Sequence, residues 1–283
     1  MKRTELRESA AGTHALQSRS AGTRDRWRAV AARACGVAFL MTFSPWLDAA
    51  SERSFAWHMV QHMLLMYIAA PLLLLAWPAR AMLRALPPPA SRRFARAMHS
   101  RLLLAAQHPT VAWLFFAAVL WGTHFTAFYN AALDDPAAHA VEHALYFGAA
   151  LLFWQPVIGP APGPSRLPYP MRMAYVMAAV PVGAFLGLAL VQTTRPLYQR
   201  YVATLGSPAA ALADQHAAGV VMWIGGGLIF FVAFMLAGVA WSLAERRLGQ
   251  RLDALHEGAT IIPIARAARL HGRDRDPDVG VRR

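Results

Sequence analysis

The chain alternates between long apolar blocks and short polar segments, and the apolar blocks determine the predicted fold. Each block is about 20 residues long, the length that a helix needs to cross a hydrocarbon core of roughly 30 Å. The pattern therefore predicts an all-α fold, a polytopic membrane helical bundle. Its six transmembrane helices are expected at about residues 29–47, 56–77, 109–130, 138–158, 171–193 and 216–241.

Local signals place several helix ends and divide the chain into three parts. Pro109 stands at a helix start, and Asp134-Asp135-Pro136 combines a capping carboxylate with a proline in the first turn. The sequence outside the spans is polar and rich in arginine. We expect a disordered basic tail over residues 1–28, a transmembrane domain over 29–244 and a basic C-terminal tail over 245–283.

The distribution of lysine and arginine predicts the orientation in the membrane. The N-terminal region through Arg33, the loop 78–101, the loop with Arg166 and Arg172 at its end, and the C-terminal tail together hold 25 of them, and the other loops hold three. Cytoplasmic loops collect positive charge, so both termini are predicted to be cytoplasmic. The loops 48–55, 131–137 and 194–215 then face outward.

Composition agrees with a membrane protein and narrows the classes of function. Only 15% of the residues are charged, whereas a soluble protein carries roughly 25%. The net charge of +13 does not indicate a nucleic-acid partner, because the arginines flank apolar spans. The single cysteine, Cys35, excludes an internal disulfide and cysteine-rich metal motifs.

Histidines gather at the outward ends of the predicted spans, which indicates a metal site. They are His58, His62, His124, His139, His143 and His216. Two pairs, His58/His62 and His139/His143, have i, i+4 spacing, which places both rings on one helix face. Ionisable side chains at membrane depth are costly, and they therefore indicate function by default.

The neighbouring residues favour copper as the metal. Imidazole suits zinc, copper, iron and nickel, whereas thioethers favour Cu(I). Met59 and Met63 stand beside the histidines of the second span, and Asp214 precedes His216 by two positions, where a carboxylate could orient an imidazole. We predict a copper site made of the histidines, Met59, Met63 and Asp214, with zinc as the alternative metal and no catalytic residues.

Other functions fit the pattern less well. A zinc protease carries His-Glu-x-x-His, whereas Glu142 here precedes the second histidine. A b-type haem electron carrier, for example with His62 and His143 as axial ligands, remains the main alternative. A transporter of protons or metal ions needs polar groups through the whole bilayer, and few lie beyond the outer half.

Several short motifs occur along the chain in a fixed order. They are His58-Met-Val-Gln-His62-Met-Leu-Leu followed by Ala-Ala-Pro71-Leu-Leu, His108-Pro109, Trp121-Gly-Thr-His124, the His139/Glu142/His143 stretch, and Asp214-Gln-His216 with Gly219 and Trp223. This set resembles the CtaG-type (caa3-type) cytochrome c oxidase assembly factors of bacteria. The resemblance covers roughly residues 37–243. That family often has seven helices, whereas six are predicted here.

The resemblance implies a multi-pass protein of the bacterial inner membrane that is not an enzyme. It implies a role in maturing haem-copper oxidase, by handling copper for the oxidase's CuB site. The implied partners are an oxidase subunit and the lipid bilayer. A periplasmic copper donor and a second copy of the chain are partners that stay open.

Overall fold

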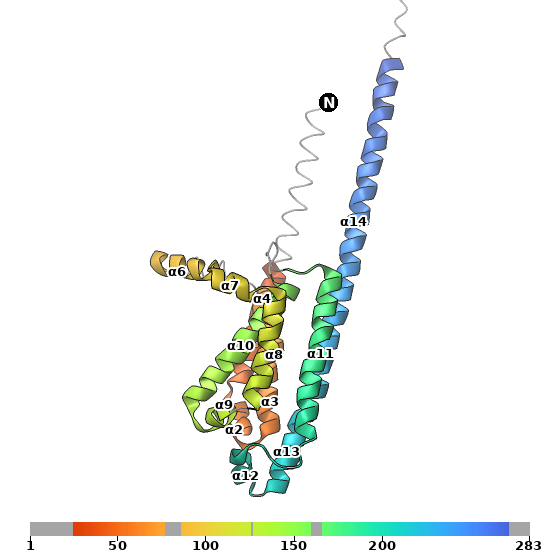
Figure 1. Cartoon of the computed structure of the whole chain (residues 1–283). Coiled ribbons are helices and arrows are strands. Elements are labelled where there is room, and N and C mark those ends of the chain that lie inside the picture. The colour runs from red at the N-terminus through yellow and green to blue at the C-terminus, as the bar shows by residue number, and fades with distance from the viewer. Residues whose placement is uncertain (1–24, 77–85, 126, 160–165, 272–283) are drawn as a thin grey trace, which may run out of the picture. The chain divides into compact units, whose positions relative to one another are not determined.

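The computed structural model describes residues 25–76, 86–125, 127–159 and 166–271, which form helices with no strand among them (Figure 1). The all-α class is therefore confirmed. The chain divides into two compact units, Met1–Phe234 and Met235–Arg283. Most of the tail predicted over residues 1–28, and the last residues of the C-terminal tail, lie outside the described residues.

Three helical stretches are long and apolar enough to cross a membrane, namely Phe55–Ala76, Tyr169–Val191 and Pro208–His256. Two bent pairs add to these if each pair is one span. The helix Asp25–Thr42 meets α2 (Pro45–Arg53) at 46°, and α8 (Pro109–His124) meets the end of α9 (Ala127–Asp134) at 67°. The described residues thus offer three to five candidate spans, and the predicted count of six is not confirmed.

The remaining predicted span is α10 (Pro136–Ile158), which is not among these candidates. It has 23 residues and is long enough to cross a bilayer. Its first turns carry His139, Glu142 and His143, and these polar residues interrupt an otherwise apolar helix. The polar residues that lower its apolar character are therefore the same ones that suggest a metal site.

The second span is built from three helical segments in sequence, α3 (Phe55–Met63), the π-helix η1 (Leu64–Ala69) and α4 (Ala70–Ala76). The widened turn ends where Ala70 N–H donates to the carbonyl oxygen of Leu65, five residues back. Pro71 follows at once, and its ring cannot fit or donate in a regular α-helical turn. Such π-turns occur frequently at functional sites, and this one comes directly after His62 and Met63.

Capping residues fix the helix starts at the end of the first unit that holds the predicted ligands. Their side chains accept a hydrogen bond from a backbone N–H of the first turn; they are Ser44, Ser54, Asp135 and Ser207, for α2, α3, α10 and α13 (Pro208–Val220), respectively. Proline follows three of these caps at the first helical position. The helix start predicted at Asp135-Pro136 is confirmed. The sixth predicted span starts earlier than expected, at Pro208.

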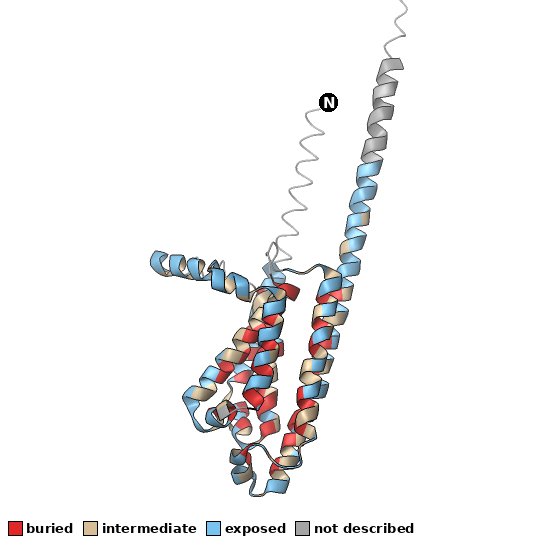
Figure 2. Cartoon of the chain, viewed as in Figure 1, coloured by how far each residue is buried: buried red, intermediate tan, exposed pale blue. Residues whose placement is uncertain are grey.

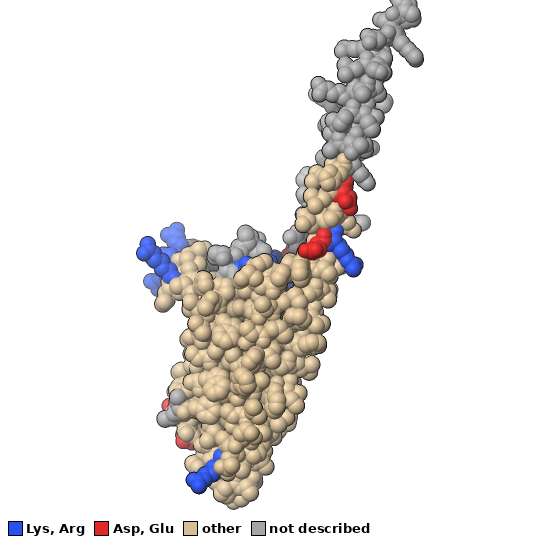
Figure 3. Space-filling view, turned by 45° about the vertical axis from the view of Figure 1, so that its right-hand side comes forward, with Lys and Arg blue, Asp and Glu red and all other residues tan. Residues whose placement is uncertain are grey.

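Within the first unit, α6 (Pro88–Met98) and α7 (Arg101–Ala106) lie at one end, and α2, α9 and α12 (Gln199–Leu205) lie at the other (Figure 1). Arginine side chains gather at the α6 end, and the surface seen between the two ends carries few charged side chains (Figure 3). This distribution is what a protein surface in contact with lipid requires.

Helices α11 (Tyr169–Val191) and α13 come into backbone contact at two glycines. A Cβ atom on Gly187 would lie 2.5 Å from the carbonyl oxygen of Gly219, and one on Gly219 would lie 2.6 Å from that of Gly187. Only glycine permits this approach. The π-helix η2 (Val221–Gly225) and α14 (Gly226–His271) follow α13 directly and continue the last predicted span.

Buried residues follow the helices of the first unit along most of their length (Figure 2), and most of these residues are hydrophobic. Aromatic residues from several helices form its core, among them Phe116, Tyr146, Phe153 and Phe230. Near the α2 and α9 end the buried residues also include ionisable, amide and hydroxyl side chains. Those with at most 8% exposure are Thr42, Ser51, His58, Gln61, His62, Thr123, His124, Glu142, His143 and Gln215.

Candidate metal centre

Four side chains from two helices converge in this polar region. His58 and His62 come from α3, and His139 and Glu142 come from the first turns of α10. One nitrogen or carboxylate oxygen from each lies within 4.8 Å of all the others. We call these four residues the His/Glu group. His58, His62 and Glu142 are buried, and His139 is partly exposed.

The distances within the His/Glu group suit a single metal ion. His58 Nε2 lies 3.0 Å from His62 Nε2, and Glu142 Oε2 lies 3.7 Å from each of these two nitrogens. Metal–nitrogen and metal–oxygen bonds of about 2.0–2.2 Å place the ligands of one ion at most about 4 Å apart. The observed separations therefore fit coordination of one ion by all three of these atoms, and a small shift of His139 would add a fourth ligand.

Several atoms of the group lack a hydrogen-bond partner among the described residues. They are both carboxylate oxygens of Glu142, Nδ1 of His62 and Nε2 of His139. A buried carboxylate without a partner is costly, and real proteins pair such groups with a cation or bind a metal there. Glu142 has no lysine or arginine within ion-pair distance in the described structure, and its only charged contacts are to the imidazoles of His58 and His62. A metal cation would supply the missing positive charge.

Tyr201 of α12 determines which nitrogen of His58 faces the group. Its hydroxyl donates to the carbonyl oxygen of Ser51 at 3.0 Å and lies 3.2 Å from His58 Nδ1. Burial and then the nearby Asp214 carboxylate raise the pKa of Tyr201 well above its ordinary value, so the hydroxyl keeps its proton. A hydroxyl has one proton to donate, so Nδ1 of His58 must donate to it. The lone pair of His58 then resides on Nε2, which points at His62 and Glu142.

His143 borders the His/Glu group, and a cavity opens beside it. The His143 ring centroid lies 5.1 Å from that of His62 and 4.3 Å from that of His139, and its Nε2 also lacks a partner. A cavity of about 440 Å³ is lined by His139 and His143 together with Asp48, Phe43 and other residues. His139 therefore belongs both to the group and to the wall of this cavity.

The predicted ligands Met59 and Met63 lie on a different face of α3 from His58. His124 of α8 lies beside them. Met59 Sδ lies 3.4 Å from His124 Nε2, at the C-terminal end of α8. These three residues line a second, small cavity together with His62. They are buried or partly buried next to the His/Glu group, but they do not belong to the set of ligand atoms that converge within 4.8 Å.

The predicted ligands His216 and Asp214 occupy structural positions instead. His216 Nε2 lies 3.0 Å from the carbonyl oxygen of Thr193. Asp214 accepts hydrogen bonds from Ser54 Oγ and from Phe55 N–H, each at 2.6 Å. Because α13 begins at Pro208, His216 lies more than two turns inside the helix. Asp214 therefore caps α3, which carries His58 and His62, and does not orient His216.

Sequence reasoning left out three residues that the structure places at the site. Glu142 could have been found, because it is the one acidic residue within the fourth predicted span. Tyr201 is 143 positions from His58 and carries no local signal. Tyr129 is fully buried. Its ring centroid lies 5.7 Å from that of His58 and 5.6 Å from that of His124.

Comparison with known proteins agrees with this picture of the membrane part. Residues 10–244 match the family model of the cytochrome c oxidase caa3 assembly factors, Caa3_CtaG. The chain belongs to this family. The match contains every member of the His/Glu group, and an assembly-factor family implies a non-catalytic role.

Relatives of this Caa3_CtaG member include uncharacterized mycobacterial proteins. A protein of Mycobacterium bovis and one of Mycobacterium tuberculosis are each 28% identical to it over 226 residues, and one of Mycobacterium leprae is 27% identical. Each match covers 77% of this chain and 34% of the relative, so the chain spans about a third of the length of these proteins. No solved structure matches the chain.

Proposed function

We propose that this Caa3_CtaG member binds copper at His58, His62, His139 and Glu142 and helps to deliver it to the CuB centre of a haem-copper oxidase. The observation that carries the proposal is the convergence of three imidazoles and an unpaired, buried carboxylate within 4.8 Å. Copper is the cargo of such a protein, and the assembly-factor family supplies the oxidase as its destination.

The family favours copper over zinc. The imidazole and carboxylate ligands by themselves accept either metal. Cytochrome c oxidase assembly requires copper for the CuB site, and the family is defined by that assembly. The proposal therefore assigns copper to the group and keeps zinc as a competitor.

The packing of the rings disfavours the alternative of a haem protein. A bis-histidine haem needs an open slot between two imidazoles for the porphyrin. Here the neighbouring rings of His58, His62, His139 and His143 are in mutual contact, with centroids 4.3–5.2 Å apart. No slot for a macrocycle separates them, so a single ion is the ligand that fits.

The position of the group suits transfer of copper. The positive-inside pattern supports an orientation in which this end of the bundle faces the periplasm of a bacterial inner membrane. The cavity lined by His139 and His143 leaves the group open to ligand exchange. A periplasmic donor would load the site, and an oxidase subunit in the same bilayer would receive the ion.

A test follows the copper content of the oxidase itself. The gene is deleted in its own organism and is then restored as wild type, His139→Ala, Glu142→Gln or His216→Ala. We expect wild type and His216→Ala to restore the ratio of copper to haem in the purified oxidase, and the other two variants to leave it low. Equal restoration by all four, with each protein present at equal amounts in the membrane, would overturn the proposal.

A further inference from the structure

We propose that the small cavity between Met59 and His124 is a second metal site, selective for Cu(I) and separate from the His/Glu group. It deepens the proposed function and depends on it for one point, that copper is the cargo. Its ligands would be Met59 Sδ and His124 Nε2, with Met63, Met66 and Met222 as the other sulfur groups of its wall.

The first observation is that Met59 and His124 face each other with lone pairs only. His124 Nδ1 lies 2.7 Å from the carbonyl oxygen of Leu120, which can only accept, so Nδ1 carries the proton. The lone pair of the neutral ring is then on Nε2, which lies 3.4 Å from Met59 Sδ. A thioether sulfur has no proton to donate. A metal cation bound between His124 Nε2 and Met59 Sδ would accept a lone pair from each of these atoms.

A protonated His124 does not explain the contact. No carboxylate of the described residues lies within ion-pair distance of its ring, and the side chain is only 3% exposed. A buried imidazolium without a counter-charge is costly. The hydroxyl groups of Thr123 and Tyr146 lie near Nδ1 and not Nε2. The nitrogen that faces Met59 therefore stays free to bind a metal.

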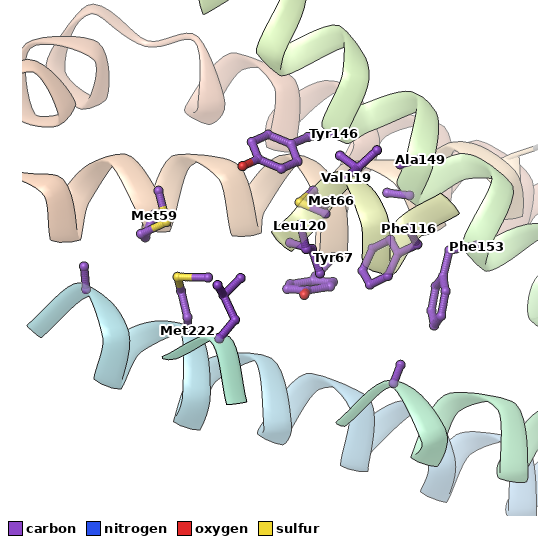
Figure 4. Packing of buried hydrophobic residues seen from close by; sticks show 14 of the residues in the cluster. Met59, Met66, Tyr67, Phe116, Val119, Leu120, Tyr146, Ala149, Phe153 and Met222 are labelled. Carbon is purple, nitrogen blue, oxygen red and sulfur yellow. The ribbon is translucent and has the colours of Figure 1, made fainter. Parts of the chain in front are cut away.

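The second observation is the concentration of sulfur around one small space. Met59, Met63, Met66 and Met222 all line the same cavity, which has a volume of about 20 Å³. Figure 4 shows Met59 and Met222 pointing toward one another from α3 and η2. A space of this size holds one water molecule or ion and no organic ligand. Thioether and imidazole donors together select Cu(I).

A glycine in η2 makes room for one of these methionines. A Cβ atom on Gly225 would lie 2.8 Å from Met63 Cε, so any larger residue there would push the Met63 side chain aside. Two helical segments with π-geometry, η1 and η2, begin at the residues that follow Met63 and Val220. The wall of the cavity is thus formed where both helices depart from regular geometry, which frequently marks a functional position.

His62 connects the two sites. Its Nε2 belongs to the His/Glu group, and the same side chain lines the sulfur-rich cavity. The His/Glu group offers a carboxylate oxygen, whereas the described lining of the cavity contains no carboxylate. Two adjacent sites of different donor softness would let Cu(I) pass inward from a site with mixed donors to one with sulfur donors. The metal keeps its oxidation state in this step.

The experiment loads the full chain, purified in detergent, with Cu(I) under anaerobic conditions and measures stoichiometry by competition with a Cu(I) chelator. X-ray absorption at the copper edge reports whether sulfur is bound. The variants are Met59→Leu, which keeps the volume of the side chain, Met222→Leu and Glu142→Gln. Met171→Leu is the matched control, because Met171 is 56% exposed and lies in α11 away from the cavity wall.

We expect wild type and Met171→Leu to bind two Cu(I) ions per chain with a sulfur signal. Met59→Leu should bind one ion and lose most of that signal, Met222→Leu should weaken it, and Glu142→Gln should keep the signal while losing the other ion. If wild type binds copper through nitrogen and oxygen alone, or if Met59→Leu keeps both ions and the sulfur signal, the second site is rejected while the His/Glu site stands. If wild type binds no copper, both proposals fail.

Discussion

The hydroxyl group of Tyr201 joins His58 to the backbone of α2: it lies 3.2 Å from His58 Nδ1 and donates to the carbonyl oxygen of Ser51 at 3.0 Å. This arrangement places a phenol outside the metal ligands in the position where ligating histidines usually find a carboxylate or a carbonyl group. It holds the ring orientation and leaves Nε2 free for the ion. A residue in α12 thereby controls a ligand in α3.

Removing this hydroxyl should weaken copper binding without removing a ligand. We expect Tyr201→Phe to lower copper affinity at the His/Glu group by about 10–100-fold, as the loss of such supporting partners typically does. Isothermal titration in detergent measures the change. Tyr198→Phe is a matched control, because its hydroxyl also donates to a backbone carbonyl, that of His124, without touching His58. Equal losses in both variants would indicate a general effect of buried hydroxyl groups.

The Glu142 side chain should destabilise the metal-free protein and stabilise the metal-bound protein. We expect Glu142→Gln to raise the free energy of unfolding of the metal-free protein by about 1–3 kcal/mol, and its thermal midpoint with it, because a neutral amide is less costly to bury than an unpaired carboxylate. The same variant should lose most of the rise in midpoint that copper produces in the wild type.

Thermal unfolding with and without copper measures both effects of Glu142→Gln. Glu52→Gln serves as the control, since Glu52 is exposed in α2 and is not one of the four converging side chains. A metal-free Glu142→Gln protein that is less stable than wild type, with an unchanged response to copper, would show that the carboxylate has a structural partner instead.

Asp214 should matter through the start of α3. We expect Asp214→Asn to lower the free energy of unfolding by about 1–2 kcal/mol, because both carboxylate oxygens accept hydrogen bonds there and an amide has only one acceptor oxygen. Asp135→Asn should be nearly neutral, since Asp135 caps α10 with a single bond and asparagine caps as well as aspartate. Unfolding in a denaturing detergent compares the two. Similar losses would mean that the second bond to Asp214 contributes nothing.

The sequence predicted the local parts of the site and missed the contacts between distant segments. The i, i+4 pairs His58/His62 and His139/His143 follow from helical periodicity alone, and the structure brings rings from both pairs into contact. The contact between Tyr201 and His58 depends on how α12 packs, which no periodicity encodes. The same holds for Asp214, which lies two positions before His216 in sequence but accepts a hydrogen bond from Ser54, the N-cap of α3.

The span count shows a second limit of periodicity. Pro45 and the break before Ala127 divide two apolar blocks into bent pairs, so a block of sufficient length does not guarantee one straight helix. The all-α class was predicted because long apolar blocks leave few other options in a bilayer. The division of the predicted ligands into a His/Glu group and a sulfur-rich cavity could not be predicted, because residues 58, 59, 62 and 63 alternate between two faces of α3.

The most direct test of the His/Glu group is copper binding by His139→Ala, Glu142→Gln and His216→Ala proteins in a Met59→Leu background, which removes the sulfur site. His139 is the most exposed member of the group, so its substitution disturbs the fold least. Equilibrium dialysis against copper at a range of concentrations gives the affinity of the remaining site. We expect the His139→Ala and Glu142→Gln proteins to bind at least about 10-fold more weakly than the background, and His216→Ala to bind equally well. Undiminished binding by both His139→Ala and Glu142→Gln would contradict the proposed metal centre.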